Sequence, residues 1–403
     1  MKSKKIEADV ALIAWIALAH GLSHFFQLVL PPLFPVLVGA LDTSYAVLGG
    51  ALAVFFTVSG VAQTAAGFLV DRFGARRLLL AGIALMALAS LLFAALPSVP
   101  MLYVTALIGG LGNSVFHPAD LAFLNGRIAP RRLGYAFSMH GLGGSLGWVL
   151  APVCVLPLAQ MYGWRVAVAA AGLIGVAVLI LLATRAVLKS PAAPRSPVHA
   201  LGSDMRLLLS PPVLLGFLFF ALYAVGMMGF QTFAAAASAQ AYEISLLAAG
   251  GALTAFLIGN SAGVLTGGAL ASRTQRHGGI VVVAMGFAAT LAAVFAAGAV
   301  PLAWLLPAMT LLGFAVGCVG PARDILIGAI APRHARGKIY GFVYSGLDVG
   351  GFVGPLLYGM LLDRMLGAWV YGIAAIFLAL SIPTLLGGAR SNLHGHTGTL
   401  SDA

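Results

Sequence analysis

Charged residues are scarce in this 403-residue chain, where Asp, Glu, Lys and Arg make up 8% and hydrophobic residues make up 61%. A soluble domain has roughly 25% charged residues, which cover its water-facing surface. A surface that faces lipid needs none. The composition therefore excludes an ordinary soluble domain and predicts an integral membrane protein in contact with the lipid bilayer.

Cysteine is also nearly absent: Cys154 and Cys318 are the two in the chain, and both lie inside apolar segments. Two distant cysteines exclude a disulfide framework and a cysteine-based zinc site, so we expect small buried hydrophobic residues. The chain has no HExxH sequence and no P-loop. We therefore predict that it is not an enzyme, that it holds no metal or other cofactor, and that ATP does not drive it.

Long apolar runs separated by turn and charge patterns predict twelve membrane-spanning helices, since one span needs about 20 mostly apolar residues. The predicted spans are 10–38, 44–69, 78–96, 101–124, 134–160 and 165–188, then 209–235, 245–271, 279–298, 302–329, 339–362 and 368–388. They form an N-terminal half (1–188) and a C-terminal half (209–389). A linker rich in Pro and Ser (189–208) separates the halves, and a tail (390–403) follows.

The formal net charge of +11 does not indicate nucleic-acid binding, because the basic residues recur in short clusters between apolar runs. Such clusters are typical of cytoplasmic loops. With the N-terminus inside, every second loop carries Lys or Arg, while Arg165 and Arg364 lie outside. We predict a multi-pass protein of the inner (cytoplasmic) membrane with both termini in the cytoplasm.

The two halves resemble each other in sequence. The segment GYAFSMHGLGGSLG from Gly134 matches GFVYSGLDVGGFVG from Gly341 at one Ser and four Gly positions. Parallel six-helix repeats predict a pseudo-twofold axis along the membrane normal, with the solute site between the halves. The shared glycines predict close approach of helix backbones.

The segment Gly67–Arg77 (GFLVDRFGARR) resembles the loop between helices 2 and 3 of the major facilitator superfamily. The resemblance implies twelve helices in two six-helix bundles and transport by alternating access. It also implies that Asp71 binds the start of helix 11 and that Arg72, Arg76 and Arg77 hold a cytoplasmic gate. The second half has Ser272 in place of the aspartate, so we expect a charged gate in the first half alone.

The segment Gly112–Ala119 (GNSVFHPA) and the sequence Ser23-His24-Phe25-Phe26-Gln27 resemble the fosmidomycin-resistance branch of that superfamily. An Asp often follows in that branch where this chain has Gln27. The resemblance implies a proton-coupled exporter (an antiporter) of small molecules or drugs.

Polar residues inside the first half mark a candidate proton site, since ionisable groups in a membrane are costly and usually functional. His20, His24 and Gln27 share one face of helix 1, and Asn113, His117 and Asp120 share one face of helix 4. Pro118 removes a backbone donor, so the helix is expected to bend beside His117. We hypothesise that His117 and Asp120 take and release the driving proton.

The second half contributes fewer polar groups. Arg323 and Asp324 are adjacent in helix 10, so we expect them to point in different directions, one to the cavity and one to a neighbouring helix. An arginine facing the cavity would favour an anionic substrate. Asp348 breaks the repeat, because Gly141 is its counterpart, and His140 precedes that glycine. Tyr223, Met227 and Gln231 share a face of helix 7 that suits a broad apolar pocket.

The leading interpretation is a monomeric, proton-coupled secondary transporter that exports a small organic solute. A carrier of an organic anion or of a metal chelate such as a siderophore is an alternative, because His20, His24, His117 and His140 are potential ligands. A passive channel and a receptor that does not transport remain alternatives of another class.

Overall fold

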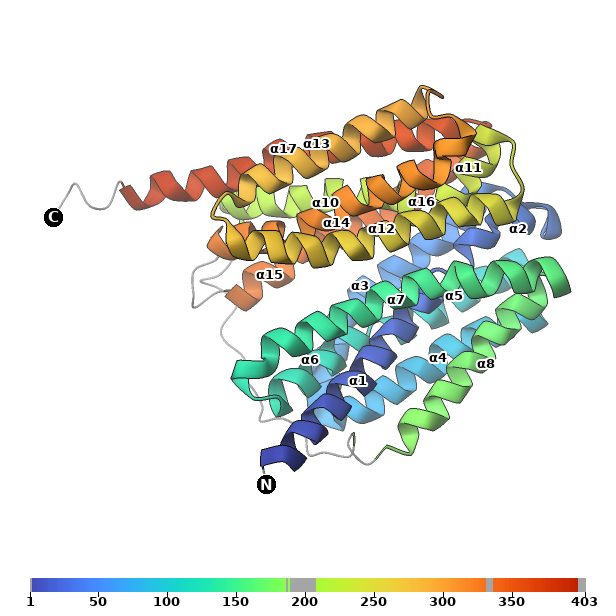
Figure 1. The fold of residues 1–403 in the computed structure, drawn as a ribbon. Coiled ribbons are helices and arrows are strands. Elements are labelled where there is room, and N and C mark those ends of the chain that lie inside the picture. The colour runs from blue at the N-terminus through green and yellow to red at the C-terminus, as the bar shows by residue number, and fades with distance from the viewer. Residues whose placement is uncertain (1, 186–187, 189–207, 331–335, 398–403) are drawn as a thin grey trace. The chain divides into compact units, whose positions relative to one another are not determined.

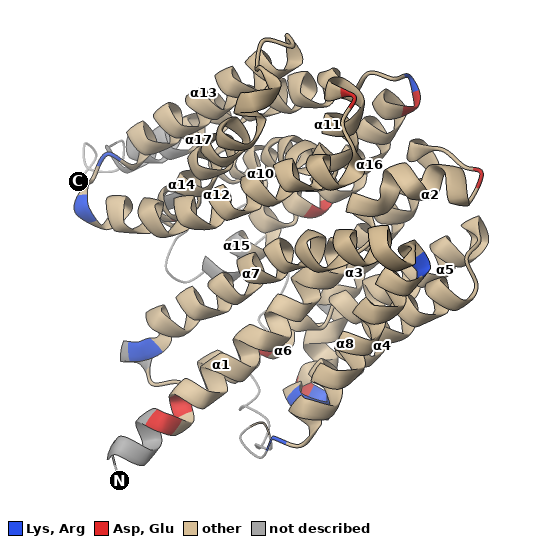
Figure 2. Ribbon diagram, turned by 45° about the vertical axis from the view of Figure 1, so that its right-hand side comes forward, with Lys and Arg blue, Asp and Glu red and all other residues tan. Residues whose placement is uncertain are grey.

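The computed structural model describes residues 2–185, 188, 208–330 and 336–397. Every regular element in these ranges is a helix, and twelve of the helical segments are long and apolar enough to cross a membrane. The predicted all-helical membrane fold with twelve spans is therefore confirmed. Most charged residues lie at or near helix ends, and the helix interiors are almost uncharged (Figure 2).

The chain forms two compact units, residues 1–196 and 197–403. The predicted linker lies outside the described residues except for its last residue. The helices of the N-terminal unit are α1 (Lys2–Gln27), η1 (Pro31–Leu33), α2 (Phe34–Ala40), α3 (Tyr45–Phe73), α4 (Ala75–Ala95), α5 (Val99–Asn113), α6 (Phe116–Arg127), α7 (Pro130–Tyr162) and α8 (Trp164–Ala183).

The C-terminal unit has the corresponding series of helices. They are α10 (Pro211–Gln231), α11 (Ala234–Tyr242), α12 (Leu246–Arg273), α13 (His277–Ala296), η3 (Leu302–Trp304), α14 (Leu305–Ile330), α15 (Arg336–Tyr344), α16 (Gly346–Asp363) and α17 (Gly367–Thr397). The last helix thus continues into the segment predicted as a tail.

Glycines bring α1 and α7 together in the N-terminal unit, where the two helices lie side by side (Figure 1). A Cβ on Gly143 would collide with the carbonyl oxygen of Ala17, and one on Gly147 would collide with that of Gly21. Only a residue without a side chain permits this approach, as small residues do at many membrane helix interfaces. The glycine pattern found in the sequence therefore has a packing cause.

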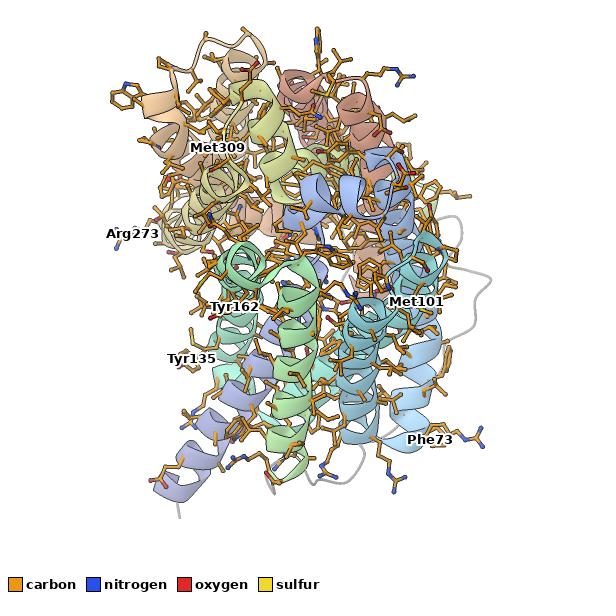
Figure 3. All side chains as sticks on the ribbon, turned by 90° about the vertical axis from the view of Figure 1, so that its right-hand side faces the viewer. Phe73, Met101, Tyr135, Tyr162, Arg273 and Met309 are labelled. Carbon is orange, nitrogen blue, oxygen red and sulfur yellow. The ribbon has the colours of Figure 1, made fainter. Side chains whose placement is uncertain are left out.

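In the C-terminal unit, glycines allow α12 and α14 to approach closely in the same way, and these two helices also lie side by side (Figure 1). A Cβ on Gly259 would meet the carbonyl oxygen of Thr310, and one on Gly263 would meet that of Phe314. Residues outside such seams are free to be large. Figure 3 shows the long side chains of the surface and places Phe73 and Met101 at opposite ends of the N-terminal bundle.

Four of the predicted spans contain an interruption of the helix, although each region still includes a candidate membrane span. The span 10–38 breaks after Gln27, and 209–235 breaks after Gln231. The span 339–362 breaks at Ser345. The span 101–124 breaks between Asn113 and Phe116, four residues or fewer before the proline that cannot donate a hydrogen bond.

Candidate functional site

The site in the N-terminal unit begins with two histidines of α1 that point at α7. His20 and His24 are one turn apart, and their ring centroids are 4.4 Å apart. A Cβ on Gly144 of α7 would lie 2.7 Å from the His24 ring and 3.0 Å from the His20 ring. The rings therefore occupy the space that a glycine leaves on the neighbouring helix.

Asp120 of α6 enters the same space from another side. Pro118 lacks the N–H that would bond to the carbonyl of Ser114, and the chain turns at Ser114 and Val115 before α6 begins. The predicted bend is present, one turn before the proline. The Asp120 side chain that follows is 0% exposed.

A single carboxylate oxygen lies between two imidazoles. Asp120 Oδ2 is 3.1 Å from His140 Nε2, within hydrogen-bond distance, and 3.2 Å from His20 Nδ1. His20 and His140 are 3% and 9% exposed. Within the described part of the chain, the other oxygen, Oδ1, has no hydrogen-bond partner. We call His20, Asp120 and His140 the proton-site cluster.

Hydrogen bonds and ring contacts extend the cluster toward the end of α1. The indole of Trp148 stacks on His24 with centroids 4.2 Å apart, and its N–H donates to Gln27 Oε1 at 3.1 Å. The Gln27 amide donates to Asn113 Oδ1 at 3.1 Å, and Asn113 donates to Ser59 at 2.7 Å. Helices α1, α3, α5 and α7 are thus joined by one polar network.

The hypothesis that His117 and Asp120 take and release the driving proton stays a prediction, and the structure shows which imidazoles lie nearest the carboxylate. The side chains within 3.2 Å of the carboxylate belong to His20 and His140. The His117 ring is 5.2 Å from the His20 ring and 6.4 Å from the His140 ring, and the residue is exposed. One turn of helix separates His117 from Asp120, and the two residues differ in burial, since His117 is exposed and Asp120 is buried.

The cluster could hold a metal only after rearrangement. The ligand atoms of His20, Asp120 and His140 lie within 4.8 Å of one another. The two imidazole rings are stacked, however, with centroids 3.6 Å apart and planes 23° apart. A bound metal lies near the plane of each imidazole that it contacts, so one ring would have to rotate. The arrangement is better suited to a shared proton.

The predicted gating residues lie at one end of α3 and α4. Gly74 joins these helices with φ +88°, a conformation that an L side chain rarely adopts. Arg76 donates to the carbonyl of Ala183 at 2.6 Å and so satisfies the C-terminal end of α8. Asp71, Arg72 and Arg77 are exposed, and their gating role stays a prediction.

The C-terminal unit contains a second polar cluster, and one expectation about it is wrong. Arg323 and Asp324 were expected to diverge, but Arg323 Nε donates to Asp324 Oδ1 at 2.9 Å. The long arginine side chain curls back to its neighbour, which backbone geometry alone does not exclude. The Tyr344 hydroxyl donates to the same oxygen at 2.7 Å. Tyr223 lies with its ring 5.5 Å from the guanidinium.

The two other predicted residues of this unit are Gln231 and Asp348. Gln231 is buried at the end of α10, and Asp348 lies half-buried in the first turn of α16. Sequence reasoning missed Trp148, Ser59, Phe220 and Tyr344. Trp148 could have been found, because it lies beside Gly147 in the glycine-rich segment.

Two serines lie in G-x-S-x-G sequences, at Gly143–Gly147 and Gly259–Gly263. In a hydrolase this motif forms a tight strand-to-helix turn that exposes the serine. Here both sequences lie inside the long helices α7 and α12, where their glycines form the helix seams. They therefore have a packing cause rather than a nucleophilic one.

Two six-helix bundles of membrane-spanning helices, one with a buried His–Asp cluster, define a polytopic transporter fold. The family model of the Major Facilitator Superfamily matches residues 16–309 and, in a second match, 219–398. The chain belongs to this superfamily. Its members are transporters and not enzymes.

Curated relatives include bacterial proteins named for multidrug efflux or multidrug resistance. The chain is 27% identical to the multidrug efflux pump Tap of Mycolicibacterium fortuitum over 408 residues, 94% of this chain and 93% of Tap. It is 33% identical to a multidrug resistance protein B homolog of Mycobacterium tuberculosis over 154 residues. That match spans 38% of this chain and 28% of the relative.

Solved structures with the same fold include a bacterial homolog of the human lysosomal transporter Spinster and the nucleoside transporter NupG. The Spinster homolog has a TM-score of 0.76 at 15% identity and covers 96% of this chain and 98% of its own. NupG has a TM-score of 0.74 at 13% identity, with coverage of 95% and 99%. At these identities the likeness shows the fold alone.

Proposed function

We propose that the protein is a proton-coupled secondary transporter that exports a small organic solute by alternating access. The observation that carries the proposal is the buried carboxylate of Asp120 between His20 and His140. The full-length similarity to a multidrug efflux pump supports the outward direction and a drug-like solute. The Phe116-His117-Pro118 sequence keeps the fosmidomycin-resistance-like branch as a prediction.

The chemistry of the cluster favours a proton as the coupling ion. A carboxylic acid and an imidazole can each bind and release one proton, and here they are in direct contact. A proton held between Asp120 Oδ2 and His140 Nε2 needs little movement to pass from one to the other, because the two atoms lie 3.1 Å apart within a hydrogen bond. Gain or loss of that proton changes the charge of a buried site and so biases a two-state structure.

A route for the proton is suggested by the exposed histidine. His117 is exposed, and its ring is 5.2 Å from the almost fully buried ring of His20. This spacing is suited to a bridging water. We propose that His117 passes protons between solvent and the proton-site cluster, which revises its role from proton carrier to entry residue.

The remaining finer predictions follow from sequence and family. The Lys and Arg distribution supports an inner-membrane location with both termini in the cytoplasm. The two-bundle fold provides for a complete transport cycle in one chain, which supports a monomer. A passive channel would not require a buried proton site, so a dependence of solute flux on a pH gradient separates the two functions.

The test uses the full chain in liposomes that contain a pH-sensitive dye. Solutes of different charge, namely ethidium, norfloxacin and 2-naphthoate, are added under an imposed pH gradient. We expect at least one to drive proton movement in the wild type, and we expect Asp120→Asn to abolish that movement while solute binding persists. Solute flux that ignores the pH gradient would show a channel or a uniporter.

Asp42→Asn is the matched control. Asp42 is an exposed carboxylate in the turn after α2, with φ +47°, a conformation that Asn also tolerates. This variant should couple protons as the wild type does. If Asp120→Asn and Asp42→Asn both transport protons normally, Asp120 is not the coupling residue.

A further inference from the structure

The cluster around Arg323 in the C-terminal unit has features of a binding site. The guanidinium carbon lies 4.8 Å from the ring centroid of Phe220 and 5.5 Å from that of Tyr223, both on α10. It lies 6.0 Å from the Tyr344 ring on α15. We call Phe220, Tyr223, Arg323, Asp324 and Tyr344 the arginine cluster. Three aromatic rings thus surround one permanent cation.

The hydrogen bonds of the cluster leave one edge of the guanidinium available. Asp324 accepts from Nε at 2.9 Å, and it is held in place by the hydroxyl of Tyr344 at 2.7 Å. A guanidinium has five N–H groups, of which four belong to its two terminal nitrogens. Across the described residues, those terminal nitrogens of Arg323 have no hydrogen-bond acceptor, and the side chain is 14% exposed.

N–H donors held at a partly buried position among aromatic rings point to a ligand that has both acceptor atoms and an apolar body. The two terminal nitrogens present parallel N–H groups that match the two oxygens of a carboxylate. The aromatic rings beside them offer flat apolar surfaces to the body of the same molecule. Asp324 competes for the cation, since it is bonded to the remaining Nε edge.

Arg323 follows a Pro-Ala sequence in the second half, as Asp120 does in the first half. Pro118-Ala119-Asp120 in α6 and Pro321-Ala322-Arg323 in α14 share a pattern and differ in the sign of the charge. Asp120 contacts residues of α1 and α7, while Arg323 contacts residues of α10 and α15. Because α15 and α16 carry the sequence repeat of α7, corresponding helices surround both charges.

We propose that the arginine cluster binds the carboxylate of an aromatic organic acid and that such acids are the class of solute carried. This inference deepens the proposed function and rests on it for the claim of transport. The binding claim stands on the arginine cluster alone. The solute's carboxylate meets the terminal nitrogens of Arg323, and its ring lies against Phe220, Tyr223 or Tyr344.

The experiment measures binding to the purified full-length protein by calorimetry, with 2-naphthoate and 2-naphthamide as probes. The two molecules share their shape and differ in charge. We expect naphthoate to bind at least tenfold more tightly than the amide. Arg323→Gln should abolish this preference, and Arg323→Lys should weaken it because the parallel N–H pair is lost.

Asp324→Asn gives a result that a purely structural role would not produce. Removal of the competing carboxylate should increase the affinity for naphthoate, by roughly threefold or more, while Arg323→Gln decreases it. Equal binding of acid and amide by the wild type, no binding of the acid, or an Asp324→Asn variant that binds the acid more weakly would each overturn the proposal. If Arg323→Gln does not fold, the acid–amide comparison and Asp324→Asn still decide.

The same materials separate this inference from the proposed function. Asp120→Asn should retain naphthoate binding, because the arginine cluster lies in the other unit. Binding that is intact in a wild type without proton-driven naphthoate flux would refute proton coupling and leave the anion site standing. Proton-driven flux of ethidium without any binding of naphthoate would refute the anion site and leave proton coupling standing.

Discussion

Replacement of Gly144 by alanine adds one methyl group to the wall of the proton-site cluster and changes no charge. The added Cβ would lie 2.7 Å from both Cε1 and Nδ1 of His24 and 3.0 Å from Cδ2 of His20. Carbon atoms in ordinary contact are about 3.5–4.0 Å apart. The rings must therefore move by roughly 1 Å, and movement of that size would disturb the 3.2 Å approach of His20 to Asp120.

The energetic effect on stability is small, because two terms oppose each other. Overpacking of a filled site costs about 1–3 kcal/mol. Replacement of a helical glycine by alanine gains roughly 1 kcal/mol. Gly141 on the same helix has nothing within 4 Å of its Cβ position, so Gly141→Ala has the gain without the cost. It is the matched control.

We expect both variants to fold, with Gly141→Ala slightly more stable and Gly144→Ala equal to the wild type or less stable by up to about 2 kcal/mol. Strain of about 2 kcal/mol on the histidine conformations reduces the intact cluster roughly thirtyfold. Proton-driven transport in liposomes should fall accordingly for Gly144→Ala and stay normal for Gly141→Ala. Wild-type transport by a folded Gly144→Ala protein would refute the view that the cluster's geometry carries the coupling.

Two further changes test how each bundle is held together. Gly263→Val should destabilise the C-terminal unit in thermal unfolding by about 2 kcal/mol or more, because the new side chain would meet the carbonyl of Phe314. Gly286→Val is the control, since its position is open and the substitution should not cause this loss. Equal melting temperatures of the two variants would contradict the close contact between α12 and α14. Asp9→Asn should cost about 1–2 kcal/mol by removing the 3.0 Å ion pair with Arg132, and a double-mutant cycle with Arg132→Gln should return a coupling energy above zero.

Most of the fold could be predicted, because lipid imposes a simple rule on the sequence. A span has to be apolar for about 20 residues, and its ends carry the charges. Interruptions inside spans were harder to predict. Pro118 indicates one of them, but the breaks after Gln231 and at Ser345 have no proline at the break.

The sequence predicted which residues belong to the site better than it predicted which of them are in contact. Spacing on one predicted helix grouped His20 with His24, and Asn113 with Asp120, because residues four or seven apart share a face. It could not show that His140, on another helix, approaches Asp120 more closely than His117 does. That contact depends on how α6 packs against α7, which is a tertiary property.

Asp120 and Arg323 are held in different ways, and we propose from this difference that the two bundles have different tasks. Asp120 lies between two imidazoles, and a carboxylate loses its charge when it binds a proton, so in the proposed function its site would switch between two charge states. Arg323 keeps its proton under all ordinary conditions. Its charge is balanced instead by Asp324 and by aromatic rings, which hold it ready for an anion. A switchable site in one repeat and a permanent cation in the other would let a single fold bind a coupling ion and a solute at corresponding positions.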